Sequence, residues 1–215
     1  EGREYFNERA IATQQTGFVL IAQMRSWLPD AVGGILWFGV DDANTAVLTP
    51  MYTSITEIPE CYRRCNGSMT EFSWTSAFWI HNWVANMAYN RYEPMIRDIR
   101  PVQKELEDSY VDLVKNTDAK ALELLKSSPA QATAYLTEVC GKVANEATAR
   151  WKKLGEYLLV KYMDGNVKKE KDGKFEENGY GQIVSPNFPG YSQEYYDQVA
   201  KSEEAKHLEV PKKDK

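Results

Sequence analysis

The chain has 215 residues, of which 43% are hydrophobic and 27% charged, with a formal net charge of -5 at pH 7. This length and apolar content suffice for a folded core, ordinarily in one domain. The acidic balance argues against binding to nucleic acid or to an anionic membrane, because both demand clustered lysine and arginine. No run approaches the roughly 18 apolar residues that cross a bilayer, so we expect no membrane span.

The first predicted element is a strand at residues 18–22, a short and continuously apolar run. Such a run is typical of a strand that is buried on both faces, as at the centre of a layered sheet. The element ends at Arg25, and a proline and two glycines between residues 29 and 34 exclude a long helix after it.

Residues 33–59 predict a β-hairpin. Two apolar runs, 35–40 and 46–52, are rich in β-branched and aromatic residues, and the polar sequence Asp-Asp-Ala-Asn separates them. Aspartate and asparagine tolerate turn dihedrals and bond to their own backbone, so this segment is expected to form the turn. Pro50 has no N–H to donate, which places the second strand at a sheet edge or in a bulge.

Helices are predicted from Ser76 onward. Residues 76–92 carry a wide apolar surface with two tryptophans, which must be covered on most sides. Pro94 and Pro101 are each expected to kink or end the helical segment in which they lie.

Residues 102–125 and 129–164 each carry an apolar stripe at three- and four-residue steps. Ser128 is a good N-cap, and Pro129 suits the first helical position. The two segments are therefore expected to pack as an antiparallel helical hairpin.

The last 50 residues are less regular. Residues 166–190 show no clear period and are expected to form a loop that lays Tyr180, Phe188 and Tyr191 over the body. One more helix is predicted within residues 192–203, and the residues after His207 should fray. The expected organisation has three parts: 1–75, the strand-containing part of a sheet layer; 76–164, a helical layer and hairpin; and 165–215, an irregular loop, short helix and tail.

Several short motifs succeed one another in the first half of the chain: Gln23-Met24-Arg25, Leu28-Pro29, Leu36-Trp37, Thr49-Pro50-Met51-Tyr52 and the helical stretch from Ser76 to Tyr92. In this order they resemble peptidase family C69, the dipeptidases of the N-terminal-nucleophile (Ntn) hydrolase superfamily. The resemblance implies an α+β fold in which strands of an Ntn-hydrolase-type αββα sandwich precede a helical layer and a long helical hairpin.

The resemblance also implies a cysteine nucleophile at the mature amino terminus, with its own α-amino group as the general base. This chain begins with Glu1, and Cys61, Cys65 and Cys140 are all internal. We therefore expect the carboxy-terminal portion of a dipeptidase, with no catalytic residue of its own and no activity alone. The implied partners are a small peptide substrate and the missing amino-terminal portion of the same protein. No cofactor is required, and oligomerisation is left open.

Two other functions stay open at this stage. One is a non-enzymatic interaction module, in which the aromatic helix and the helical hairpin bind a partner. The other is an acylase of the same superfamily that acts on non-peptide amides.

Arg25 is the first candidate substrate-binding residue. A guanidinium at a strand end can make two parallel hydrogen bonds to a carboxylate, and a dipeptide always has a carboxylate at its carboxyl end. The alternative is a structural ion pair with Asp30, Asp41 or Asp42.

Three further candidates lie on the predicted hairpin. The amide of Asn44 suits an oxyanion donor at the tip, although such a residue more often simply makes the turn. Trp37 and Tyr52 are candidate walls of a substrate cleft, and their alternative is a place in the core.

The cysteines and histidines bear on disulfide bonding, on location and on metal binding. Three reduced thiols are the favoured interpretation of the cysteines. A bond between Cys61 and Cys65 through a short turn is the alternative and would suit an oxidising compartment, and a periplasmic or extracellular location is expected rather than a cytoplasmic one. His81 and His207 are the only histidines, so no metal site is expected, and His81 is interpreted as a core or interface residue.

Overall fold

The computed structural model describes residues 2–6, 8–184 and 186–203, so Glu1 and the predicted fraying after His207 lie outside it. The chain divides into two compact units, Glu1–Leu159 and Val160–Lys215, which are described separately. The elements of the first unit are β1 (Phe18–Met24), α1 (Asp30–Gly33), β2 (Gly34–Val40), β3 (Thr49–Tyr52), the 3-10 turn η1 (Glu60–Tyr62), α2 (Ala77–Asn90), α3 (Tyr92–Ser127) and α4 (Pro129–Tyr162), whose last turn enters the second unit. The combination of helices with antiparallel sheet confirms the α+β class.

The predicted hairpin is confirmed. Strands β2 and β3 pair antiparallel, with Ile35 opposite Tyr52 and Phe38 opposite Thr49. The second strand begins at Thr49 instead of Ala46, because the residues before it are held in a long turn by the Asp42 carboxylate. The sheet order is β1-β2-β3, so Pro50 lies on an edge strand, as its missing donor predicts.

The prediction that residues 18–22 form a strand buried on both faces is wrong. These residues do form a strand, β1, but it pairs only with β2 and lies at the open edge of the sheet. Phe18 and Ile21, which alternate on opposite faces of the strand, are 59% and 54% exposed. A continuously apolar strand has two faces that other parts of the protein must cover. Within the described unit, both faces of β1 are largely exposed.

The helical hairpin is confirmed, with one correction. Ser128 alone separates α3 from α4, and its Oγ accepts a hydrogen bond from the N–H of Gln131 at 3.3 Å. Helix α3 continues through Pro101, so of the two expected effects, a kink or an end, the end is absent there. Pro94 falls in the first turn of α3, where the backbone N–H groups have no helical partner anyway.

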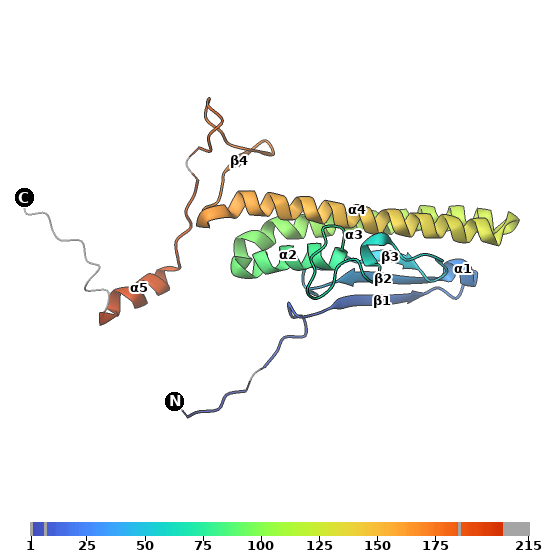
Figure 1. The fold of residues 1–215 in the computed structure, drawn as a ribbon, viewed down its shortest axis with the longest axis horizontal. Helices are drawn as coiled ribbons and strands as arrows, with labels where there is room; N and C mark the ends of the chain where they lie inside the picture. Colours follow the sequence, from blue (N-terminus) through green and yellow to red (C-terminus); the bar gives the residue numbers. More distant parts are fainter. Residues whose placement is uncertain (1, 7, 185, 204–215) are drawn as a thin grey trace, which may run out of the picture. The chain divides into compact units, whose positions relative to one another are not determined.

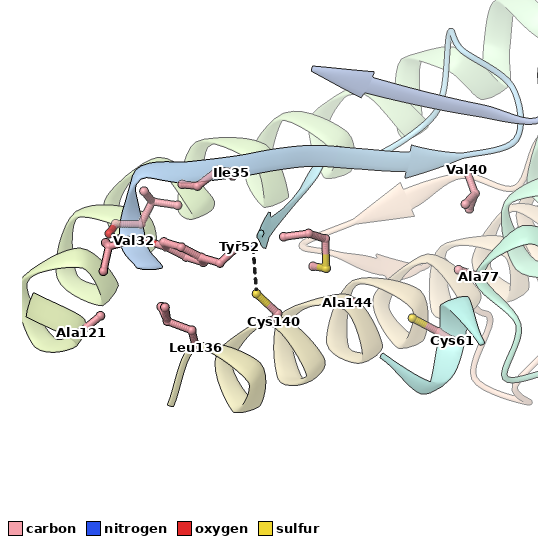
Figure 2. Packing of buried hydrophobic residues seen from close by; sticks show 12 residues of the cluster. Val32, Ile35, Val40, Tyr52, Cys61, Ala77, Ala121, Leu136, Cys140 and Ala144 are labelled. Carbon is pink, nitrogen blue, oxygen red and sulfur yellow. Dashed lines mark hydrogen bonds between the residues drawn. The ribbon is translucent and has the colours of Figure 1, made fainter. Parts of the chain in front are cut away.

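The core lies between the sheet and the helical hairpin, where α3 and α4 run beside β2 and β3 (Figure 1). Figure 2 shows Val32, Ile35 and Tyr52 of the sheet side meeting Ala121 of α3 and Leu136 of α4. Both apolar stripes are thus buried, as predicted.

Cys140 of α4 closes the outer edge of β3. Its Sγ accepts a hydrogen bond from the N–H of Tyr52 at 3.3 Å, drawn dashed in Figure 2, and donates to the carbonyl oxygen of Pro50 at 3.5 Å. The thiol therefore occupies the position that a neighbouring strand would take. The sheet is closed by a side chain at β3 and open at β1.

The second unit is a small irregular body. It holds the 3-10 turn η2 (Met163–Gly165), a two-stranded ribbon of β4 (Glu170–Lys171) and β5 (Lys174–Phe175), and the helix α5 (Gln193–Lys201). The ribbon was not predicted, although Asp172 and Gly173 at its tip, with φ of 53° and 74°, form a typical hairpin turn. The helix confirms the prediction within residues 192–203. Within this unit Tyr180, Phe188 and Tyr191 are exposed, and their expected contact with the body of the protein stays a prediction.

Candidate functional site

Arg25 lies at the end of β1, where its guanidinium forms a bidentate ion pair with the carboxylate of Asp118 of α3. Nη1 donates to Asp118 Oδ2, and Nη2 donates to Oδ1 at 3.1 Å. The guanidinium also donates to two backbone carbonyls, those of Gly33 at 3.3 Å and Val32 at 2.5 Å. The residue is 7% exposed, so the protein itself provides the anion and most of the acceptors.

Tyr52 joins the same cluster. Its hydroxyl donates to Asp118 Oδ1 at 2.6 Å, and its ring centroid lies 5.9 Å from the Cζ of Arg25. Burial raises the pKa of Tyr52, and the hydrogen bond to Asp118 raises it further, so the phenol is a permanent donor. Two sequence candidates are thus brought together by an acid that the sequence pattern did not indicate.

This cluster fits the structural alternative for Arg25, but with a different partner. The acids considered from the sequence were Asp30, Asp41 and Asp42, all near Arg25 along the chain, whereas Asp118 lies 93 residues away. The role of Arg25 in binding a substrate carboxylate stays a prediction. The ion pair itself joins the end of β1, the turn before β2 and the middle of α3.

Trp37 lies elsewhere, in an open cleft of about 440 Å³ between the sheet and α3. Its Nε1 donates to Gln23 Oε1 at 2.9 Å, and the carboxylate of Glu107 accepts a hydrogen bond from the N–H of Leu48 at 3.1 Å. The remaining walls are apolar and come from Ile21, Ala22 and Val111. Trp37 is therefore a half-buried wall of this cleft, on the face of the sheet that lies toward α3.

Asn44 lies at the hairpin tip and is held by α3. Its Nδ2 donates to the hydroxyl of Tyr92 at 2.9 Å, while its Oδ1 and its backbone carbonyl oxygen both accept from Arg100. The amide therefore anchors the tip, and its predicted part in an oxyanion site stays untested.

Asp41, beside Asn44 in the turn, is a buried acid. Its φ of 67° is in the left-handed region, and Oδ1 accepts from Asn82 of α2 at 2.8 Å. Its Oδ2 is buried without a hydrogen-bond partner among the described residues. Burial raises the pKa of Asp41, while hydrogen bonds from the backbone of Asp42 and from Asn82 oppose that rise.

Asp42, by contrast, has partners for both carboxylate oxygens. Oδ2 accepts from the N–H and the hydroxyl of Thr45 at 3.0 and 2.9 Å, and Oδ1 accepts from the hydroxyl of Tyr89 at 2.9 Å. Partial burial and this hydrogen bond to Asp42 raise the pKa of Tyr89 to about 12. Asn82, Asn86 and Asn90 recur every four residues along α2, but of these only Asn82 contacts the turn, while Asn86 and Asn90 donate to carbonyl oxygens of their own helix.

The three cysteines are free thiols, so no bond joins Cys61 to Cys65. Burial raises the pKa of Cys61, and it raises the pKa of Cys140 to about 11, which keeps both protonated and weakly nucleophilic. Cys65 is exposed, with a left-handed φ of 72°.

His81 is buried in the core, as predicted, and stacks on Trp151 with ring centroids 4.9 Å apart. Burial lowers its pKa to about 3, so the imidazole is neutral. Across residues 2–6, 8–184 and 186–203, no three His, Cys, Asp or Glu side chains gather as metal ligands. In the same residues, no helix combines the length and the apolarity that a bilayer crossing requires.

Comparison with known proteins finds similarity to peptidases. Residues 1–105 match the model of peptidase family C69. The chain is 31% identical over 143 residues to a "Probable dipeptidase" of Latilactobacillus sakei, a match that covers 65% of this chain and 28% of that protein. It is 28% identical over 163 residues to "Probable dipeptidase B" of Lactococcus lactis subsp. lactis (strain IL1403), a match that covers 74% of this chain and 32% of that protein. Residues 1–105 of the chain are thus similar to peptidase family C69, and the chain spans about 30% of the length of these two relatives.

Proposed function

We propose that this chain is part of a cysteine dipeptidase of the N-terminal-nucleophile type, which hydrolyses small peptides. The observation that carries the proposal is the match to family C69 together with two relatives that are both named as probable dipeptidases. In this proposal the chain supplies part of the sheet, one helical layer and walls of the substrate cleft. The nucleophilic cysteine belongs to the remainder of the enzyme.

The open side of the sheet supports this division of roles. Gly17 O accepts a hydrogen bond from the N–H of Asp41, and the N–H of Arg25 donates to Gly33 O, so odd-numbered residues of β1 bond to β2. The N–H groups of the even-numbered residues between them point to the outer edge. We propose that a further strand pairs there, and that a second layer covers the apolar face of β1, as in an αββα sandwich. Cys140 already closes the opposite edge at β3.

The thiols of this chain support the proposal that it is inactive alone. Amide hydrolysis by this mechanism needs a thiolate beside a base. Cys61 and Cys140 are buried with raised pKa values, and His81 is buried against Trp151. Cys65 is exposed in a left-handed turn of a surface loop, and its thiol makes no hydrogen bond to a base among the described residues.

The test is an assay of the chain on a panel of dipeptides, beside the protein extended to the full length of its relatives. We expect turnover only by the extended protein, and we expect Cys65→Ala not to abolish that turnover. Turnover by the chain alone that disappeared in Cys61→Ala or Cys65→Ala would contradict both the mechanism and the role of the missing part.

A further inference from the structure

A second cavity, of about 360 Å³, lies between the sheet and the start of α2. The loop of residues 62–69 forms one of its walls. Most of its lining is apolar or aromatic, from Phe38, Val40, Tyr62, Met69, Phe78 and Trp79. None of the four candidate substrate-binding residues predicted from the sequence lines it.

The loop that forms one wall is a folded structure. Trp79 Nε1 donates to the carbonyl oxygen of Ser68 at 3.1 Å, and Gly67 packs so tightly on the indole that a Cβ there would lie 2.8 Å from it. Asn66 Oδ1 accepts hydrogen bonds from Ser73 and Thr75 at 2.6 and 3.0 Å. The cavity is therefore a built feature of the fold.

One end of the cavity is polar. Ser76, which lines it, is the N-cap residue of α2 but makes no capping hydrogen bond with its side chain. The residue is 5% exposed, and its hydroxyl has no hydrogen-bond partner among the described residues. The first N–H groups of α2 lie directly behind it, and the N-terminus of a 14-residue helix carries a partial positive charge.

A free cation lines the same cavity. Arg63 is engaged by Glu57 at 3.7 Å and Glu60 at 3.3 Å. Its neighbour Arg64 lines the cavity and has no ion-pair or hydrogen-bond partner in the described part of the chain. The wall thus presents one uncompensated guanidinium beside an uncapped helix end and an unpartnered hydroxyl.

We propose that this cavity binds the carboxylate of a small molecule with an apolar body. The carboxylate bonds to the Ser76 hydroxyl and the first N–H groups of α2, Arg64 neutralises it from the rim, and the aromatic walls take the apolar part. One guanidinium and one helix end match a single negative charge, whereas a phosphate dianion would leave charge uncompensated. The carboxyl end of a short peptide with an apolar last residue fits this description, and that choice of natural ligand rests on the proposed function.

Calorimetric titration of the chain with N-acetyl-phenylalanine tests the site. The matched probe N-acetyl-phenylalanine amide, which lacks the charge, is expected to bind about tenfold more weakly. Ser76→Ala and Arg64→Gln should each weaken binding of the acid about fivefold and leave binding of the amide unchanged. Arg97→Gln, which removes an exposed arginine of α3 and the same charge, is the control and should change neither.

Three results would overturn the site: equal affinity for the acid and the amide, equal effects of Arg64→Gln and Arg97→Gln, or competition by inorganic phosphate at similar concentration. The titration needs no catalysis. Binding by the chain with no turnover in the extended protein would therefore count against the dipeptidase proposal alone, and turnover without binding would count against the cavity alone.

Discussion

Removing the carboxylate of Asp118 is expected to destabilise the fold severely. The side chains of Arg25 and Asp118 are only 6% and 17% exposed, so Asp118→Ala leaves a guanidinium buried without its anion. Breaking such a pair from one side costs about 3–5 kcal/mol. The hydroxyl of Tyr52 loses its 2.6 Å acceptor and keeps only the 3.4 Å contact to the carbonyl oxygen of Val114, which adds about 1 kcal/mol.

The expected loss is therefore about 4–6 kcal/mol in the free energy of unfolding, measured by urea denaturation followed by circular dichroism. The double variant Arg25→Met with Asp118→Ala should be more stable than Asp118→Ala alone, because it no longer buries an unpaired charge. The control is Glu93→Ala, which breaks an ion pair with Arg97 whose side chains are 79% and 73% exposed. That change should cost about 0.5 kcal/mol or less. Equal losses in Asp118→Ala and Glu93→Ala would refute the reasoning.

Two further predictions concern buried groups. Cys140→Ala leaves the N–H of Tyr52 without its acceptor and should cost about 1–3 kcal/mol in the same denaturation assay. Cys140→Ser retains a donor and an acceptor, so it should cost less. Equal losses in the two variants would rule out the role of Cys140 in closing the edge of β3. His81 has its pKa lowered from 6.5 to about 3 in the folded state, so its contribution to stability is complete above about pH 6.5 and is lost as the pH falls toward 3. The free energy of unfolding should then fall by up to about 1.4 kcal/mol per pH unit below about pH 6.5. His81→Gln should flatten that slope. An unchanged slope in the variant would show that other titrating groups cause the pH dependence.

Local patterns predicted much of the fold. The hairpin results from two apolar runs around Asp-Asp-Ala-Asn, and the long helical pair results from two apolar stripes separated by Ser128-Pro129. Pro101 does not end α3, because the loss of one backbone hydrogen bond is small beside the tertiary packing of a 36-residue helix.

The site is less predictable from the sequence than the fold. Arg25 and Tyr52 both stand out in the sequence, but their common partner Asp118 is one acid among many on a long helix, and no local spacing marks it. The apolarity of β1 predicts burial, yet apolarity records only that a surface must be covered and does not say by which part of the protein. Ser76 is recognisable in the sequence only as the start of a helix, since an uncapped hydroxyl is visible only in three dimensions.

Amide hydrogen exchange along β1 would show whether the rest of the enzyme continues this sheet, when measured in the chain alone and in the protein extended to the full length of its relatives. The amides of Val19, Ile21 and Gln23 face β2 and should be protected in both. Those of Leu20 and Ala22 face the open edge, so we predict rapid exchange in the chain alone and strong protection in the extended protein. Rapid exchange at Leu20 and Ala22 in both proteins would contradict the claim that a further strand pairs with β1.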